Sequence, residues 1–264
     1  MTLGKIIAVA NQKGGVGKTT TSITLSALLA KKGKKVILID ADPQGNATSG
    51  VGLQGQIQKS VYELLVEDIK MEETLVQTNS KNLKVCPSNI NLAGAEVELV
   101  SMMSREQRLK EKLEEVKSQY DYMIIDCPPS LGLITLNAFT AADSVLIPIQ
   151  CEYYALEGLG QLMNTINLVK KHLNKNLEIE GALLTMYDVR TNLSNQVVNE
   201  VKKYFGDKVY KTVIPRNVKL SEAPSYGMPI TEYDGHSKGA RSYDKFVNEL
   251  LKRNDIAKKP KHMK

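Results

Sequence analysis

Short apolar segments alternate along the chain with longer segments of helical periodicity. Several apolar segments are hydrophobic at consecutive positions, which is typical of strands buried on both faces of a parallel sheet. The predicted strands are Lys5–Ala10, Lys35–Asp40, Leu83–Cys86, Tyr122–Cys127, Ser144–Gln150, Gly181–Met186 and Tyr210–Ile214. The predicted helices are Lys18–Lys32, Glu96–Lys117, Leu193–Phe205 and Ala240–Leu251.

The alternation of strand and helix predicts right-handed βαβ units. The fold class is therefore α/β, with a mainly parallel, open, twisted sheet and helices on both faces. Ligands of such sheets bind at the carboxyl ends of the strands. The sequence contains no internal repeat and no Gly/Ser linker, so we expect one domain over residues 1–254 and a disordered basic tail over 255–264.

Composition excludes several broad classes of protein. With 264 residues, 42% hydrophobic and 24% charged, the chain can bury a full core and is neither fibrous nor disordered as a whole. The formal net charge is +6, but four lysines lie in the last seven residues. Total charge is therefore a weak argument for a nucleic-acid partner.

The cysteines and the apolar segments indicate a cytoplasmic protein. The three cysteines, Cys86, Cys127 and Cys151, include no CxxC pair, which argues against a disulfide framework or a zinc site. We see no signal peptide. The most apolar long stretch, from Cys127 to Cys151, is interrupted by three prolines and an aspartate, so we expect no membrane span.

A phosphate-binding loop follows the first predicted strand. Its glycines allow the backbone to wrap an anion, and the following helix adds its positive end. Lys18 is placed to neutralise the β- and γ-phosphates, and the Thr19 hydroxyl can bind Mg²⁺. The predicted ATP-binding residues of this loop are Lys13, Gly14, Gly15, Val16, Gly17, Lys18, Thr19 and Thr20.

The loop departs from the general GxxxxGK[ST] pattern. Gln12 stands where the first glycine would fall, and Lys13 follows it. In this the loop resembles the deviant Walker-type loop of the ParA/MinD group of ATPases. In that group, the lysine that matches Lys13 reaches across a dimer to the partner's ATP. The resemblance implies a sandwich homodimer that forms with ATP.

Two further predicted strands end in carboxylates. Asp40 and Asp42 follow one strand and Asp126 ends another, so all three are expected at the ligand edge, where carboxylates hold Mg²⁺ or position water. The segments from Asp40 and Asp126 resemble the switch I and switch II segments of the family, in which the acid matching Asp42 supports hydrolysis. We predict Lys13, Lys18, Asp42 and Asp126 as catalytic residues.

The predicted magnesium ligands are Thr19, Asp42 and Asp126, the carboxylates in part through water. No arginine finger is evident beside these motifs. The resemblance therefore implies weak Mg²⁺-dependent hydrolysis of ATP to ADP and phosphate, stimulated by a partner.

The carboxyl-terminal third supplies candidates for base and DNA contacts. By resemblance, Pro215 and Asn217 lie near the adenine, and Arg190 and Lys219 match basic positions that bind nonspecific double-stranded DNA. A basic strip of this kind binds phosphates without reading sequence. Other basic residues of this region are Lys202, Lys203, Arg216, Lys238 and Arg241.

Three segments are most similar to the short, Soj-type branch of the ParA family. They are Asn11–Gly15, the DPQGNATSG segment from Asp42, and Ile214–Ile230. The resemblance implies a DNA segregation protein on the nucleoid, with a ParB-type centromere-binding partner and no membrane attachment. Because the loop begins at residue 13, we expect no amino-terminal operator-binding extension.

Three alternatives stay open on the sequence. A MinD-like membrane ATPase would need an amphipathic carboxyl-terminal helix, but Ala240–Leu251 is better explained as a helix packed on the core. An iron–sulfur carrier would need bridging cysteines. The third alternative is a non-enzymatic scaffold gated by ATP. In that case, a variant with Asp42 replaced would behave like the unaltered protein.

Overall fold

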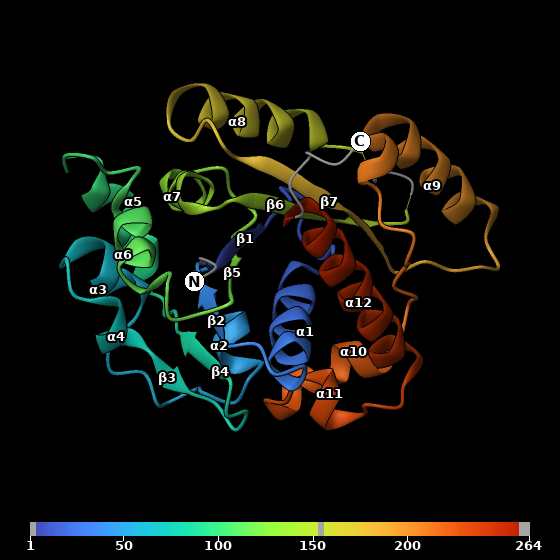
Figure 1. Ribbon diagram of the computed structural model, residues 1–264, viewed down its shortest axis with the longest axis horizontal. Helices are drawn as coiled ribbons and strands as arrows, with labels where there is room; N and C mark the ends of the chain where they lie inside the picture. The colour runs from blue at the N-terminus through green and yellow to red at the C-terminus, as the bar shows by residue number, and fades with distance from the viewer. Residues whose placement is uncertain (1–3, 153–155, 259–264) are drawn as a thin grey trace.

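The computed structural model describes residues 4–152 and 156–258, and a sheet forms its centre (Figure 1). The seven strands described have the order β3-β4-β2-β5-β1-β6-β7. Neighbouring strands are parallel except β3 and β4, which are antiparallel. The strands are β1 (Lys5–Val9), β2 (Val36–Asp40), β3 (Val76–Gln77), β4 (Leu83–Cys86), β5 (Tyr122–Asp126), β6 (Ser144–Gln150) and β7 (Glu178–Thr185).

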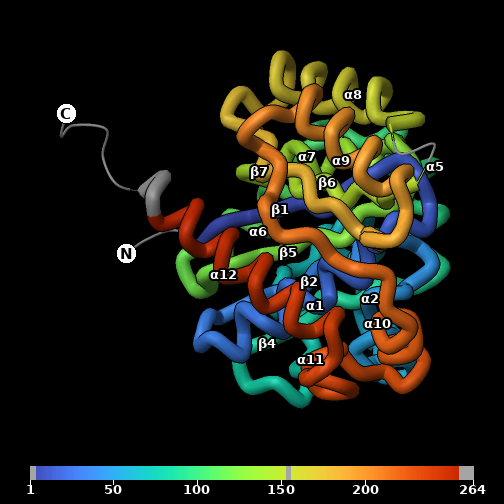
Figure 2. Tube along the Cα trace, turned by 90° about the vertical axis from the view of Figure 1, so that its right-hand side faces the viewer, coloured from blue at the N-terminus to red at the C-terminus, as the bar shows by residue number. Residues whose placement is uncertain are grey.

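Helices cover both faces of the sheet, and in Figure 2 the strands lie between the two layers. One layer packs on Ile7 and Val9 of β1, and it consists of α1 (Lys18–Lys31), α2 (Asn46–Ser49), α10 (Val218–Glu222), α11 (Ile230–Tyr233) and α12 (Lys238–Lys258). The other packs on Ile6 and Ala8, and it consists of α3 (Val61–Val66), α4 (Met71–Thr74), α5 (Leu92–Leu99), α6 (Arg108–Val116), α7 (Leu133–Ala141), α8 (Leu159–His172) and α9 (Asn192–Phe205). The predicted fold class is confirmed.

The strands with consecutive apolar residues are buried on both faces of the sheet, as the sequence predicts. Every residue of β2 and β5 is buried, because alternate side chains enter the two opposite cores. The central strands β1 and β5 pair in register from Lys5 with Tyr122 to Val9 with Asp126. The carboxyl ends of these strands therefore meet at one edge, where the predicted site residues lie.

The long helix predicted over Glu96–Lys117 is wrong. Two helices, α5 and α6, occupy this region, and Ser104 between them has a φ of 52°. The buried Asn137 of α7 donates to the carbonyl of Arg105 (2.7 Å) and accepts from the amide of Leu109 (3.1 Å). This side chain replaces helical hydrogen bonds at the break, which periodicity alone does not reveal.

The strand predicted over Tyr210–Ile214 is also wrong. Tyr210 and Ile214 donate to carbonyls of β7, but the two residues after Tyr210 leave the ladder. The amides of Lys211 and Thr212 donate instead to the carboxylate of Glu249 on α12 (2.9 and 3.0 Å). A side chain from the last helix thus takes the place of a strand partner.

The last helix runs further than the sequence indicates. α12 extends from Lys238 to Lys258, so residues 255–258 of the predicted tail are helical, and 259–264 lie outside the described residues. Tyr243, Phe246 and Leu250 are buried, which confirms the prediction of a helix packed on the core. Within 4–152 and 156–258, no helix is both long and apolar enough to cross a membrane.

Gly181 generates a prediction about stability. A Cβ at this position of β7 would lie 2.6 Å from the carbonyl oxygen of Lys208 and 2.7 Å from Tyr210 Cε2. We expect Gly181→Ala to lower the free energy of unfolding by about 1–3 kcal/mol, because the segment beside β7 must move. Urea unfolding of the nucleotide-free protein measures this.

Gly160→Ala is the matched control. This glycine lies in α8, and a Cβ there would meet nothing within 4 Å. The substitution should raise the free energy of unfolding by about 0.5–1 kcal/mol through helix propensity. Equal midpoints for the two variants would contradict the packing described at Gly181.

Candidate nucleotide-binding site

The phosphate-binding loop connects β1 to α1 and is anchored at both ends. Asn11 donates from its side chain to the carbonyl of Pro148 (2.8 Å) and accepts from the amide of Lys13 (3.0 Å). At the other end, the Thr185 hydroxyl donates to the carbonyl of Val16 (2.8 Å), whose side chain is buried. Strands β6 and β7 therefore hold the loop in shape from one side.

The loop leaves room for an anion. Gly15 and Gly17 have φ angles of 73° and 89°, a region that favours glycine. A Cβ at Gly14 or Gly15 would meet nothing within 4 Å, and no side chain caps the start of α1. The amide groups and the positive end of a 14-residue helix thus face open space, as a phosphate cradle requires.

Lys18 lies under this cradle rather than on the surface. Its ammonium donates to the carbonyl of Lys13 (3.0 Å), and only 7% of the residue is exposed. Burial lowers the pKa of Lys18, while the charges of Asp126 and Asp42 act in the opposite direction. The lysine is therefore a cation held close to the predicted carboxylates, as the sequence suggests.

Asp126 at the end of β5 is the most deeply placed of the predicted ligands. Its Oδ1 accepts from the Ser22 hydroxyl (2.8 Å), whereas the buried Oδ2 has no hydrogen-bond partner among the described residues. Burial raises the pKa of Asp126, the charge of Asp40 adds to the effect, and the hydrogen bond from Ser22 and the nearby Thr19 hydroxyl oppose it. A bound cation would compensate this orphaned oxygen.

The donor set fits Mg²⁺ beside a phosphate chain. Thr19 supplies a hydroxyl next to Asp126, and the carboxylate supplies an oxygen that nothing else uses. Magnesium prefers such oxygen donors and keeps several waters, so a few protein ligands suffice.

Asp40 and Asp42 have different roles. Both oxygens of the buried Asp40 are occupied, because Oδ1 accepts from the amide of Asp42 (3.2 Å) and Oδ2 from the amide and hydroxyl of Thr48 (both 2.7 Å). Asp42 accepts from the amide of Gln44 through Oδ1 (3.0 Å), and its charge acts on Lys18. Asp40 therefore stabilises the turn into α2, and Asp42 is the acid that faces the site.

A cavity of about 260 Å³ adjoins the loop and includes the two residues predicted to contact the base. Gly17 and Thr20 line it from one side, and Pro215 and Asn217 from the other. Asn217 Oδ1 accepts from the amide of Lys219 (2.9 Å) and so caps α10, which fixes this wall. The structure thus brings together two predicted groups that are about 200 residues apart in sequence.

Sequence reasoning did not predict the rest of the lining of this cavity, which includes Thr185, Met186 and Tyr243. Thr185 and Met186 come from the end of β7, and Tyr243 comes from α12. The Tyr243 hydroxyl lies 2.9 Å from Thr21 Oγ1 in the buried contact between α12 and α1. The position of Thr185 at a strand end was a signal for it, but nothing local distinguishes Tyr243 from an ordinary core residue.

The predicted DNA-binding residues lie on the surface near the same edge. Arg190 forms a two-point ion pair with Asp188 in the loop after β7, at 2.9 and 2.6 Å. Lys219 on α10 pairs with Glu222 at 2.9 Å. Lys202 lies elsewhere, because it lines a hollow at the amino edge of the sheet.

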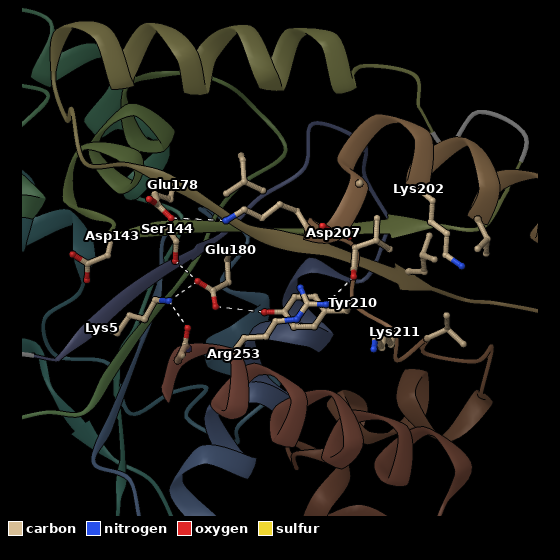
Figure 3. Close-up of a pocket in the computed structure, with 18 of the residues that line it drawn as sticks. Lys5, Asp143, Ser144, Glu178, Glu180, Lys202, Asp207, Tyr210, Lys211 and Arg253 are labelled. Atoms are coloured by element: carbon tan, nitrogen blue, oxygen red, sulfur yellow. Dashed lines mark hydrogen bonds and ion pairs between the residues drawn. The ribbon is translucent and has the colours of Figure 1, made fainter. Parts of the chain in front are cut away.

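That hollow, of about 1140 Å³, is shown in Figure 3. The buried Glu180 accepts from Lys5 (2.6 Å) and Ser144 (2.6 Å), and Arg253 lies 4.1 Å from the ring centre of Tyr210. These contacts join β1, β6, β7 and α12. We assign this network to stability, because it lies at the opposite edge from the phosphate-binding loop.

The cysteines do not favour the iron–sulfur alternative. Cys86, Cys127 and Cys151 are buried free thiols, and burial raises the pKa of each of them, for Cys86 and Cys151 to about 12. Cluster ligands are thiolates. In the part of the chain that the structure describes, no group of three or more His, Cys, Asp or Glu is placed to hold a metal ion.

Comparison with known proteins identifies the family. The family described as "AAA domain" matches residues 4–179. The sporulation initiation inhibitor protein Soj of Bacillus subtilis is 63% identical over 249 residues, covering 94% of this chain and 98% of that protein. The chromosome partitioning protein ParA of Myxococcus xanthus is 55% identical over 261 residues, covering 98% and 92%. The chain belongs to the ParA/Soj family of chromosome-partitioning ATPases.

Solved structures agree with this family and its fold. The cobyrinic acid a,c-diamide synthase of Mycobacterium smegmatis, with a bound ATP analog and magnesium, has a TM-score of 0.85 at 39% identity, covering 97% of this chain and 98% of that one. The septum site-determining protein MinD of Pyrococcus horikoshii, complexed with Mg-ADP, has a TM-score of 0.78 at 25% identity, covering 98% and 100%. Identity to the partition proteins is much higher, which disfavours the MinD-like alternative.

The orphaned oxygen of Asp126 generates the second prediction. Asp126→Asn keeps the acceptor for Ser22 but leaves the buried Lys18 less compensated, so we expect the free energy of unfolding without nucleotide to fall by about 1–3 kcal/mol. In wild type, ATP with Mg²⁺ should raise the melting temperature more than ATP with EDTA does. This Mg²⁺-dependent increase should be lost in Asp126→Asn. Thermal unfolding with ATP, in Mg²⁺ and in EDTA, measures both effects.

Asp121→Asn is the control for this experiment. Asp121 precedes β5 at the opposite edge and accepts from the amide of Lys35 (2.8 Å). Its variant should keep the full Mg²⁺-dependent rise. A full rise in Asp126→Asn as well would show that Asp126 does not hold the metal.

Proposed function

We propose that this ATPase binds Mg²⁺-ATP at the edge formed by β1, β2 and β5 and pairs with a second copy across the nucleotides. The homodimer then holds nonspecific double-stranded DNA, and hydrolysis to ADP and phosphate returns it to monomers. Family membership and the geometry of the loop support this cycle. A partition protein of this kind acts on the nucleoid and needs a ParB-type protein at the cargo.

The two lysines of the loop carry the proposal. Lys18 turns inward and binds the carbonyl of Lys13, a position that supports its assignment to the phosphates of this chain's own nucleotide. The Lys13 side chain lies beside a separate hollow of about 520 Å³, lined also by Gln12, Gly158 and Gln161. Within residues 4–152 and 156–258 its ammonium forms no ion pair. A phosphate chain bound to a second copy is a suitable partner for this charge.

We assign different roles in hydrolysis to the residues at the carboxyl edge of the sheet. Mg²⁺, when bound, supplies charge neutralisation at the β- and γ-phosphates. Thr19 and Asp126 would hold it, and Lys18 would bind the phosphate oxygens. Asp42 would orient the attacking water and accept its proton, since its Oδ2 makes no hydrogen bond among the described residues. Pro215 and Asn217 would contact the base, and the amides of Gly14, Gly15 and Gly17 the phosphates.

Lys13→Gln tests the dimer. We expect the variant to bind ATP with an affinity within about threefold of wild type, since Lys18 and the loop amides stay in place. It should remain monomeric with Mg²⁺-ATP, where wild type becomes a dimer. Light scattering measures the mass, and Lys34→Gln, a partly exposed lysine after α1, is the control. A dimeric Lys13→Gln protein would contradict the proposed role.

Asp42→Ala separates an ATP switch from a non-enzymatic scaffold. If Asp42 supports hydrolysis, the variant should lose at least about 10-fold in ATPase rate, while it still dimerises with ATP. It should also hold DNA without releasing it. Release is followed after excess competitor DNA is added. Wild-type hydrolysis and release in Asp42→Ala would favour the scaffold.

A further inference from the structure

Three cations near the carboxyl edge each pair with a carboxylate of the same chain. Arg190 pairs with Asp188 at 2.6 Å, and Lys219 pairs with Glu222 at 2.9 Å. The third pair joins Arg216 to Glu152, also at 2.6 Å. All six side chains are at least partly exposed, and the Arg190 side chain is 84% exposed.

These pairs belong to one continuous part of the surface. The loop after β7 and the segment before α10 are linked, because the amide of Arg216 donates to the carbonyl of Tyr187 (3.2 Å). Asp188 follows directly in that loop, and the charge of Arg216 acts on it. Lys219 lies three residues after Arg216, where α10 begins. Glu152, the partner of Arg216, lies just after the end of β6.

The carboxylates are fixed in place rather than mobile. Asp188 Oδ1 accepts from the amide of Arg190 (3.0 Å) as well as from its side chain. Glu222 Oε2 accepts from the hydroxyl of Tyr233 (2.9 Å) while it binds Lys219, whose ammonium lies 5.6 Å from the centre of the Tyr233 ring. The acids beside Arg190 and Lys219 are therefore held by contacts other than their ion pairs.

A carboxylate placed in this way occupies the position that a phosphate would take. Arg190 binds Asp188 through two nitrogens, the fork geometry with which arginine also binds phosphate. A phosphate must displace the acid, and the freed acid then repels it. One exposed pair resists weakly, by up to about fivefold in affinity. Several such pairs, on two copies of the chain, oppose phosphate binding more strongly than one pair does.

We propose that Arg190, Arg216 and Lys219 form one phosphate-binding surface, and that Asp188, Glu152 and Glu222 compete with DNA phosphate for them. A single copy is thereby kept off DNA, and the paired surfaces of a dimer overcome the competition. The inference rests on the proposed function, adds Arg216 to the DNA-binding residues, and gives the three acids a role.

The test replaces the acids while it keeps their hydrogen bonds. Asp188→Asn, Glu222→Gln and the double variant retain acceptors for the Arg190 amide and the Tyr233 hydroxyl. Binding to random-sequence duplex DNA is measured with Mg²⁺-ATP and without nucleotide, at several salt concentrations. Glu73→Gln is the matched control, because Glu73 forms a similar exposed pair with Lys59 (2.7 Å). Glu73 lies on α4, in the opposite helix layer.

We expect each single acid variant to bind DNA about two- to fivefold more tightly than Glu73→Gln, in both nucleotide conditions. The plot of log affinity against log salt should also become steeper, because in wild type salt screens the competing ion pair and so offsets part of the loss of phosphate binding. Arg190→Ala and Lys219→Ala should change affinity and slope in the opposite direction.

Two failures are distinguishable. If wild type binds DNA with ATP but Asp188→Asn and Glu222→Gln match Glu73→Gln in affinity and slope, the competition is refuted and the proposed function stands. If wild type does not bind DNA with ATP at any salt concentration, the proposed function itself is refuted, and the inference with it.

Discussion

The parallel pairing of β5 between β1 and β2 is the constraint on which the site depends. It sets Asp126 opposite Val9 on one side and opposite Asp40 on the other. The phosphate-binding loop, the turn that carries Asp42 and the end of β5 therefore meet at one edge. A slip of β5 by one residue would move each of its side chains into the opposite core, whose packing it does not match. The precision of the site is thus a consequence of the core beneath it.

Charge is distributed differently inside and outside this edge. Inside, Lys18 and Asp126 are buried with incomplete pairing, and Asp126 keeps an oxygen without a hydrogen bond among the described residues. Such a site is costly until a ligand of matching charge compensates it. Outside, Arg190 and Lys219 are already paired with acids. A nucleotide would therefore meet an uncompensated site, whereas DNA bound as we propose would first have to open these ion pairs.

The sequence predicted the central sheet and the phosphate-binding loop well, since both are local in their signals. A run such as Tyr122–Asp126 carries its own burial pattern, and the glycines of the loop carry their own backbone requirement. The failures depend on contacts between distant segments. Asn137 divides the predicted helix over Glu96–Lys117, and Glu249 takes the amides of the predicted strand over Tyr210–Ile214. Tyr243 was missed in the base cavity for the same reason.

The most direct test of the account is binding to random-sequence duplex DNA with ATP, with ADP and without nucleotide, at two salt concentrations, with anionic vesicles as a parallel target. The account predicts that DNA is held with ATP, that binding with ADP or without nucleotide is far weaker, and that salt releases the DNA. Binding to vesicles without binding to DNA would contradict it and would restore the membrane ATPase alternative. Equal binding to DNA in all three nucleotide conditions would contradict the ATP switch.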